Sequence, residues 1–561
     1  MTDEGDINES ARPVFFEELD LLGFPGLGFT YPKCEEPLLW AAGRSYYYKG
    51  EKIAVANGGG FYRDVSIVLH KEPFALEPIN LDQLLERNKD KIHYYTHDAV
   101  DFIRDTAAKY KDDVDIIVVS FSGGKDSVVI ADLVKRALDS SEFTIIFADT
   151  WLESPFTYAT VEDFARENTN LSIVSAKYER NALEMWADIG SPSRMNRWCH
   201  TIFKTAPIIK KIRELTGIAD PKILLFDGIR AEESSRRQKY DRVQAGVKVS
   251  FQTNASPILK WSYEEIFLYI FHRELKFNKM YRYGYSRVGC LICPYSSQWG
   301  EFLTRKLFFK EIKPYLSYLR SYAENAGICD VENYISTGGW KSRSGGLYIL
   351  QGGNRVTFSQ KGNNFEIIFP ENTDDFWFWL GLVGKLVHNT NRGELLFEGK
   401  IYTAHKKVLK TGTKYTIHDT DGNRNLENLL KRVAYKSSYC VQCGACEATC
   451  PIGSLSLSSK KELLNGCVHC HNCLNAVEKG CWTAKSLSYV GFRSVKSMET
   501  KGMSRYQTFG LQQKWLNYFF TGNDWLVGNA DLGNRQIESM KNWLKDAQLW
   551  NGSPTPIGEA F

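Results

Sequence analysis

Short apolar runs alternate with amphipathic ones in the first half of the chain. The run VDIIVVSF (114–121) is β-branched and apolar on both faces, which is typical of an inner strand of a parallel sheet. From Ser127 the apolar positions recur at helical spacing, with charged residues on the other side. The runs FTIIFADT (143–150) and KILLFDGIR (222–230) are predicted to be further strands. This alternation indicates an α/β fold built on a parallel sheet.

The turn between the first strand and its helix reads SGGKDS. Its two glycines permit a positive-φ turn and the close approach of a ligand to the backbone, which a Cβ would obstruct. A strand that passes through such a turn into a helix points backbone N–H groups and the helix N-terminus at one place, and that geometry favours anions. The candidate ligand-binding residues are Ser122, Gly123, Gly124, Lys125, Asp126 and Ser127.

The outer segments have other patterns. Residues 1–94 hold short aromatic and β-branched runs between glycines, which predict a small β-rich accessory domain. Residues 335–436 are expected to form a basic α+β module, and residues 491–561 a tail of aromatic helices such as LQQKWLNYFF and ESMKNWLKDAQLW. Strands of the module are expected in GLYILQGG (346–353), NFEIIF (364–369) and GELLFEGKIYTAHKKVLKTGTKYTIHD (393–419). Its lysines form either a strip that tracks nucleic-acid phosphates or a solvated face, and they are Lys406, Lys407, Lys410 and Lys414.

Length, charge and composition restrict which classes of protein this chain can belong to. A chain of 561 residues is too long for one core, so about two to four domains are expected. The net charge of +4 permits nucleic-acid binding without arguing for it. The polar start MTDEGDINESARP shows no secretory signal, and no stretch of about 18 apolar residues occurs. We therefore expect a cytoplasmic protein with no membrane partner, whose oligomeric state the sequence leaves open.

Eight of the thirteen cysteines lie between 440 and 481, as C-x2-C-x2-C-x3-C-P and then C-x2-C-x2-C-x7-C. This pattern resembles the bacterial 2[4Fe–4S] ferredoxins, in which the fourth cysteine of the run ligates the other cluster. The resemblance implies a ferredoxin-like α+β domain at 437–490 with two [4Fe–4S] clusters, although the x7 spacing exceeds the usual x3. Zinc is the alternative. The implied ligands are Cys440, Cys443, Cys446 and Cys481 for one cluster, and Cys450, Cys467, Cys470 and Cys473 for the second.

The turn SGGKDS resembles the PP-loop of the ATP pyrophosphatase superfamily. Further stretches, including GIRAEES (228–234) and YRYGYSRVGCLICP (281–294), are similar to the phosphoadenosine phosphosulfate (PAPS) reductase family within it. The resemblance implies a PP-loop domain at 95–334, with an adenine nucleotide alpha hydrolase-like parallel sheet and helices on both faces. It also implies that ATP binds with Mg²⁺ and that four more residues lie near the nucleotide, namely Asp149, Thr150, Gly228 and Arg230.

Three more cysteines fall inside that domain, Cys199, Cys290 and Cys293. A cysteine followed by a distant C-x2-C is similar to the cluster site of adenosine phosphosulfate (APS) reductases, but His200 stands where their second cysteine would be. The resemblance implies a third iron–sulfur cluster whose fourth ligand is His200, a substrate sulfur or a distant residue such as Cys34. Zinc and three reduced buried cysteines are the alternatives.

These features together predict an ATP-dependent sulfur-transfer enzyme. Lys125 and Asp126 would serve the adenylylation, the three thiols would carry sulfur from a donor such as a cysteine desulfurase, and the ferredoxin clusters would supply electrons. The family resemblance is close to sulfur-transfer proteins of DNA phosphorothioation systems, so the expected acceptor is DNA, with tRNA next. The alternatives are a ferredoxin-coupled PAPS or APS reductase and a non-catalytic electron-transfer or nucleotide-sensing subunit. Two features favour ATP over a sulfonucleotide as the substrate. The SGGKDS turn is intact, and no cysteine in an E-C-G-x-H motif follows Cys481.

Overall fold

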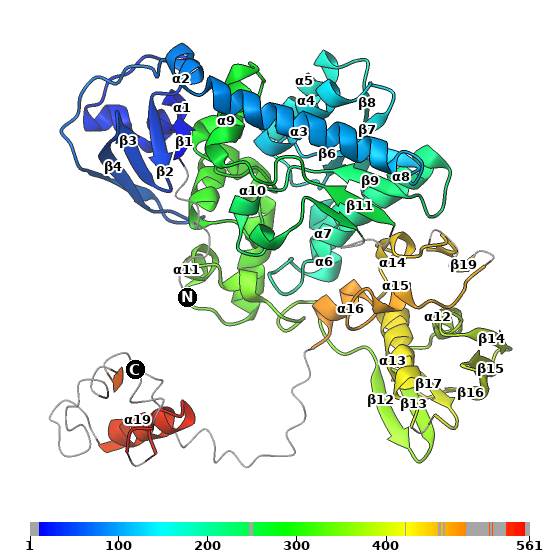
Figure 1. Ribbon diagram of the computed structural model, residues 1–561. Helices are drawn as coiled ribbons and strands as arrows, with labels where there is room; N and C mark the ends of the chain where they lie inside the picture. Colours follow the sequence, from blue (N-terminus) through cyan, green and yellow to red (C-terminus); the bar gives the residue numbers. More distant parts are fainter. Residues whose placement is uncertain are drawn as a thin grey trace. The chain divides into compact units, whose positions relative to one another are not determined.

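The computed structural model describes residues 11–245, 251–420, 422–457, 462–463, 466–489, 515–516, 519, 534–551 and 553–555. The chain divides into two compact units, Met1–Tyr489 and Val490–Phe561 (Figure 1). In the second unit the structure describes α19 (Asn534–Asp546), where an aromatic helix is expected. Most of the expected helix LQQKWLNYFF lies outside the described residues.

A six-stranded sheet forms the centre of the first unit. The strand order is β10-β11-β9-β6-β7-β8, and all neighbours are parallel except the edge pair β10 and β11. The chain fills the sheet from β6 to β8 in one direction and then returns to the other side of β6, so the order reverses between β6 and β9. Its strands are β6 (Ile116–Phe121), β7 (Phe143–Asp149), β8 (Ser172–Lys177), β9 (Ile223–Phe226), β10 (Val243–Ala245) and β11 (Gln252–Ala255).

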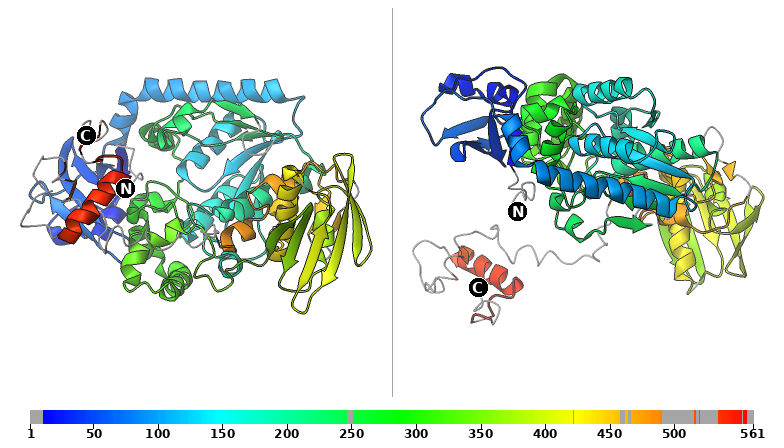
Figure 2. Two further views of the ribbon diagram at one scale, coloured as in Figure 1. Left: turned by 90° about the horizontal axis from the view of Figure 1, so that it is seen from below. Right: turned by 45° about the horizontal axis from the view of Figure 1, so that its top comes forward.

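Helices cover both faces of this sheet (Figure 2). The side chains alternate accordingly, because Val119 packs into the core cluster that holds α4 residues, while Val118 packs with Ile212 of α8 on the other face. The predicted mixed α/β class with a parallel sheet and covered faces is therefore confirmed. The helices of this region are α3 (Lys89–Tyr110), α4 (Lys125–Ala137), α5 (Pro155–Glu167), α6 (Ala182–Ile189), α8 (Ala206–Thr216), α9 (Tyr263–His272), α10 (Gln298–Asn325) and α11 (Val331–Ser336).

The N-terminal region is an antiparallel sheet in the order β1 to β5. It contacts the central region where the Ala11 backbone N–H donates to a Glu264 carboxylate oxygen at 2.9 Å. Inside the N-terminal region a buried ion pair joins β1 to α1, in which Arg12 donates to both carboxylate oxygens of Glu18 at 2.6 Å. Tyr46 donates to the same carboxylate at 2.7 Å. The elements are β1 (Ala11–Val14), α1 (Phe16–Leu22), β2 (Leu39–Ala42), β3 (Ser45–Tyr48), β4 (Glu51–Gly58), β5 (Val65–Leu69) and α2 (Leu81–Arg87).

A second antiparallel sheet follows α11, in the order β12-β13-β17-β16-β15-β14. The expected strand in GLYILQGG is wrong: these residues form turns, with Tyr348 at φ 64°, because Gly346 and Gly353 pack against the backbone of Leu487. The other expected runs are strands. The elements are β12 (Thr357–Lys361), β13 (Asn364–Phe369), α12 (Asp375–Leu380), β14 (Lys385–His388), β15 (Arg392–Phe397), β16 (Lys400–Val408), β17 (Thr413–Ile417) and α13 (Arg424–Tyr439).

The cysteine-rich segment comes directly after α13 and is mostly loops and short helices. It contains α14 (Ala445–Ala448), the paired strands β18 (Leu455–Ser456) and β19 (Glu462–Leu463), α15 (Asn472–Asn475) and α16 (Trp482–Leu487). In the part of the chain that the structure describes, no helix has the length and apolar character needed to cross a membrane.

The Arg12–Glu18 pair gives the first prediction. Glu18→Ala leaves Arg12 buried without its carboxylate, so it should lower the free energy of unfolding by about 3–5 kcal/mol. Urea unfolding combined with hydrogen exchange of the β3 and β4 amides measures this. The control Glu77→Ala removes an exposed partner of Lys49 and should cost at most about 1 kcal/mol. Equal losses in the two variants would contradict the role of burial.

Candidate functional site

The SGGKDS turn connects the C-terminal end of β6 to the first turn of α4. Gly123 has a φ of 69°, and a Cβ there would lie 3.0 Å from the Thr157 side chain. Ser127 closes the turn: its hydroxyl accepts from the Ser122 backbone N–H at 3.1 Å and donates to the Gly124 carbonyl at 2.8 Å. The turn therefore presents the N-terminus of α4 at the carboxyl edge of the sheet, where the strand order reverses beside β6 and ligands of open α/β sheets bind.

A buried ionic bridge links this turn to the loop after β9. The Asp126 carboxylate accepts from Lys125 Nζ and from Arg230 Nε, each at 2.8 Å. Burial raises the pKa of Asp126, but the two cations outweigh burial and hold it below its usual value. Burial also lowers the pKa of Lys125 to about 8. Gly228 permits the bridge, because a Cβ there would lie 3.0 Å from the Asp126 Cβ.

The residues after β7 connect this edge to a thiol. Asp149 accepts from Tyr158 at 2.8 Å and pairs with Lys177 at 2.7 Å. Thr150 donates to the buried Glu153 carboxylate at 2.7 Å, and its hydroxyl lies 3.4 Å from Cys290 Sγ. Asp149 and Thr150, which were predicted to lie near the nucleotide, and one of the predicted thiols, Cys290, thus lie at the same edge of the sheet.

The three predicted thiols of this domain lie near one another, because Cys290 and Cys293 are among the charges that act on Cys199. Burial raises the pKa of Cys199 to about 12, and the nearby Cys290 and Cys293 add to the effect. Burial likewise raises the pKa of Cys290 to about 12. Cys199 lies in α7 (Trp198–His200), which continues into a π-helical turn, η2 (Thr201–Thr205), a geometry common at functional sites.

The two candidate protein ligands for a fourth position at these thiols are His200 and Cys34, and each has a polar neighbour outside the thiol group. His200 Nδ1 lies 3.4 Å from Thr205 Oγ1, and the Cys34 thiol donates to the Glu36 carbonyl at 3.5 Å. Thiols are the donor type that either a metal centre or a sulfur carrier can use.

Two charged residues at the thiols were not predicted from the sequence. Burial raises the pKa of Glu153, which accepts from Thr150 and whose charge acts on Cys290. Burial lowers the pKa of Lys204, but the charges of Cys290 and Glu153 outweigh this and raise it above its usual value. Lys204 is five residues after Cys199, and the π-helical turn aligns that spacing on one face. The 3.6-residue period of an α-helix places residues five apart on different faces, so that period did not indicate that Lys204 and Cys199 are neighbours.

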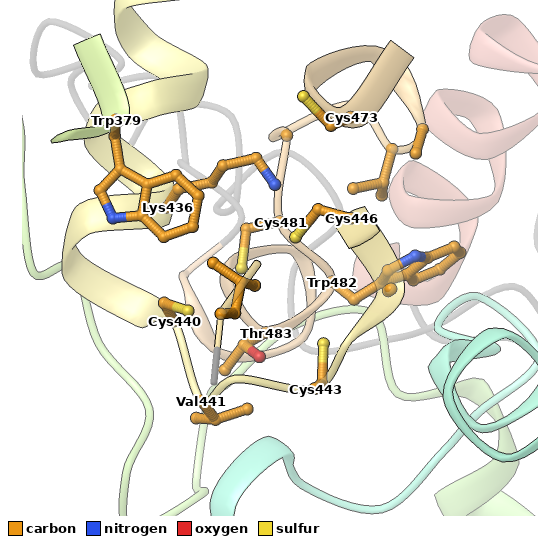
Figure 3. A pocket seen from close by; sticks show the side chains of 15 residues that line it. Trp379, Lys436, Cys440, Val441, Cys443, Cys446, Cys473, Cys481, Trp482 and Thr483 are labelled. Carbon is orange, nitrogen blue, oxygen red and sulfur yellow. The ribbon is translucent and has the colours of Figure 1, made fainter. Parts of the chain in front are cut away.

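The C-terminal cysteines line a cavity below α13 (Figure 3). Burial raises the pKa of Cys443 well above its usual value, and the neighbouring Cys446, Cys481 and Cys440 add to the shift. These four are the predicted first ligand set. Thr483 also lines the cavity, and its buried hydroxyl has no hydrogen-bond partner among the described residues. The chemistry of four thiols and an unsatisfied hydroxyl suits a sulfur-rich centre that accepts hydrogen bonds.

The cysteines of the predicted second ligand set do not all lie in the same buried environment. Burial raises the pKa of Cys473 to about 12, with Cys446, Cys450 and Cys467 among the charges that act on it. Cys470 is exposed. Within the described residues, which omit 458–461 and 464–465, no three His, Cys, Asp or Glu side chains are arranged to hold a metal ion.

The cysteine-rich segment packs directly against the central domain. Arg213 of α8 donates to the carbonyls of Glu447 and Cys450, at 3.0 and 2.6 Å. Tyr178 donates to the Gln442 carbonyl at 3.3 Å, and Cys443 belongs to the same buried cluster as Trp198.

The lysines of the basic module do not form a uniform free strip. Lys406 pairs with Asp374, and Lys414 pairs with Glu366 at 2.6 Å. Lys407 and Lys414 are register partners on β16 and β17. Half of the predicted strip is therefore neutralised by neighbouring carboxylates.

Comparisons with known proteins cover part of the chain. Residues 116–296 match the phosphoadenosine phosphosulfate reductase domain. An uncharacterized protein of Methanocaldococcus jannaschii is 34% identical over 46% of this chain, and the matched region spans 52% of that protein, about half its length. An adenosine 5'-phosphosulfate reductase of Geobacillus is 29% identical over 35% of this chain and 80% of its own.

Among solved structures, the U34-tRNA thiolase NcsA from Methanococcus maripaludis with its [4Fe-4S] cluster is similar over 44% of this chain and 78% of its own. With 14% identity and a TM-score of 0.27, that likeness carries no functional argument. The domain match coincides with the strands, the SGGKDS turn and the three thiols described above. Residues 116–296 of this chain are thus similar to the phosphoadenosine phosphosulfate reductase domain, and the remaining residues lie outside that match.

Proposed function

We propose that this protein is an ATP-dependent sulfur-transfer enzyme that acts on nucleic acid. The observation that carries the proposal is the contact between Thr150 and Cys290, at 3.4 Å, on the sheet edge that also presents the SGGKDS turn. A nucleotide on that turn and a sulfur on these thiols would meet without a large movement of the chain. Proximity of this kind supplies much of the barrier reduction in two-substrate reactions.

The proposed reaction has three balanced steps. An acceptor oxygen attacks the α-phosphorus of ATP, the bond to the β-phosphate oxygen breaks, and pyrophosphate leaves. The terminal sulfur of a cysteine persulfide, formed by a donor of the cysteine desulfurase class, then displaces AMP, which departs with the acceptor oxygen. The resulting acceptor–S–S–Cys disulfide takes up two electrons and two protons, giving the thiolated acceptor and the free thiol.

The residues of the turn would bind and orient the phosphates. Backbone N–H groups at the start of α4 and the Lys125 ammonium would hold the pyrophosphate part of ATP, with Mg²⁺ as its counter-ion. Arg230 would contact a phosphate oxygen, because its ion pair with Asp126 already holds the guanidinium beside the turn. Lys204 would stabilise the thiolate or persulfide anion at Cys290.

The cysteine-rich segment would provide the electrons for the last step. Clusters held by the two cysteine sets would pass single electrons at low potential. Aromatic side chains lie between the first set and Cys199: Tyr178 is next to Cys443, its ring centroid is 6.0 Å from that of Phe203, and Phe203 is 5.7 Å from Trp198. This packing supports a short route from the cavity to the thiols.

A nucleic-acid acceptor is supported by Trp151, which comes two residues after the end of β7. Its backbone has a φ of 65°, its Nε1 donates to the Tyr178 carbonyl at 2.7 Å, and Lys177 lies 3.5 Å from its ring centroid. An exposed aromatic ring beside a cation is a platform on which bases stack. The proposed acceptor oxygen is a non-bridging DNA phosphate oxygen, with a tRNA base carbonyl second.

A second candidate function is a ferredoxin-coupled reductase of APS or PAPS, favoured by the Geobacillus relative that is named an adenosine 5'-phosphosulfate reductase. In that reaction Cys290 or Cys293 would take the sulfonate sulfur, and AMP or its 3'-phosphate would leave. The two functions differ in the nucleotide consumed.

The first test measures which nucleotide is turned over. Anaerobic protein with its clusters reconstituted, given nucleic acid and a desulfurase, should convert ATP to AMP and pyrophosphate. Lys125→Ala removes a phosphate contact, and Asp126→Ala removes the bridge that holds Lys125 and Arg230. Each should lower that rate at least about 100-fold while leaving iron content unchanged, because neither residue is a cysteine ligand. Sulfite formation from PAPS or APS, with ATP untouched, would replace this proposal by the reductase.

The second test uses the low pKa of Lys125. Below about pH 8 the ammonium is charged and attracts the phosphates, so ATP affinity should fall as pH rises from 7.5 to 9.5. Lys125→Arg keeps the charge over that range and should bind ATP with little pH dependence. Calorimetric titration at each pH measures both, and parallel profiles for the two proteins would contradict the role of Lys125.

A further inference from the structure

One buried cation lies among the C-terminal thiols. Lys436 of α13 is 2% exposed, and its side chain extends into the cavity that the cysteines line (Figure 3). It hydrogen-bonds to Cys446, and Cys481 and Cys473 are the next charges that act on it. Its Nζ also lies 5.4 Å from the ring centroid of Trp379.

The partners of Lys436 are unusual for a buried lysine. No carboxylate in the described part of the chain pairs with it, and the anionic groups that it faces are thiols. A buried ammonium is costly unless an anion compensates it. Four thiolates around a [4Fe–4S] core carry a net negative charge, so a loaded cluster would supply the compensation that the protein alone does not.

Lys436 also faces both cysteine sets. Cys446 and Cys481 belong to the first predicted set, and Cys473 belongs to the second. The helix α13 ends at Tyr439, directly before the first ligand Cys440, so the lysine is held by the element from which the ligand loop begins. One fixed charge is therefore placed where it acts on two centres.

We propose that Lys436 is a positioning residue that raises the reduction potentials of the clusters on either side of it. The inference rests on the proposed function, because it requires clusters at these cysteines. Reduction adds one electron to a cluster and makes it more negative, so a nearby buried cation stabilises the reduced form more than the oxidised form. The unpaired Thr483 hydroxyl would act in the same direction as a hydrogen-bond donor to cluster sulfur.

The test is a redox titration of the full-length, anaerobically reconstituted protein, with dithionite as reductant and electron paramagnetic resonance as readout. Lys436→Met removes the charge at similar volume and should shift at least one cluster midpoint to a more negative potential. Lys436→Gln should shift it less, and Lys436→Arg should leave it near the wild-type value. The matched control is Lys431→Gln, which removes a charge from the same helix where the lysine lies over the Phe365 ring.

The outcomes separate this inference from the function on which it rests. Wild-type protein without iron would overturn the cluster proposal, and this inference with it. Cluster-loaded Lys436→Met with wild-type midpoints, or an equal shift in Lys431→Gln, would overturn the role of Lys436 alone. If Lys436→Met loses iron, Lys436→Gln supplies the measurement. Loss of iron from all three variants, including the charge-preserving arginine, would overturn the inference in favour of a packing role.

Discussion

The ionic bridge through Asp126 is the interaction on which the site depends. A single carboxylate accepts from Lys125 on the turn after β6 and from Arg230 on the loop after β9. Those two strands are neighbours in the sheet but far apart in sequence, and the strand order reverses between them. The bridge therefore fixes these two loops relative to each other, and Gly228 lets their backbones approach closely enough for it to form.

The second constraint is the packing of the cysteine-rich segment on the same domain. Arg213 and Tyr178 donate to backbone carbonyls of that segment. These hydrogen bonds therefore depend on the backbone conformation of the segment and not on the identity of its side chains. The consequence is that Cys443 shares a buried cluster with the aromatic residues around Cys199. The SGGKDS turn, the three thiols and the cysteine-lined cavity thus follow one another through contiguous packing. The proposed coupling of sulfur transfer to electron transfer needs such an arrangement.

Much of this site was predictable, because its signals are local. Short stretches of sequence are enough to predict the strands β6, β7 and β9, the SGGKDS turn and the cysteine spacing. The residues that sequence analysis did not identify depend on tertiary contacts. Glu153 and Lys204 are brought to the thiols only by the fold. Lys436 lies before the cysteine motif on an amphipathic helix whose sequence has no feature that distinguishes this lysine. GLYILQGG has strand-like residues, yet contact with Leu487 turns it into a loop. The boundaries expected at 94/95 and 436/437 fall inside α3 and α13, since a continuous helix leaves no composition change at a junction.

The central claim is that sulfur on the thiols and the nucleotide on the turn take part in one reaction, and following labelled sulfur tests it most directly. The anaerobic protein is loaded with ³⁵S by a cysteine desulfurase, separated from the donor, and then given ATP and nucleic acid, with Cys199→Ser treated in parallel. The account predicts that label leaves the wild-type protein for the polymer only when ATP is present, in step with AMP formation, and that Cys199→Ser transfers none. AMP formation while the label stays on the protein, or transfer that proceeds equally without ATP, would contradict it.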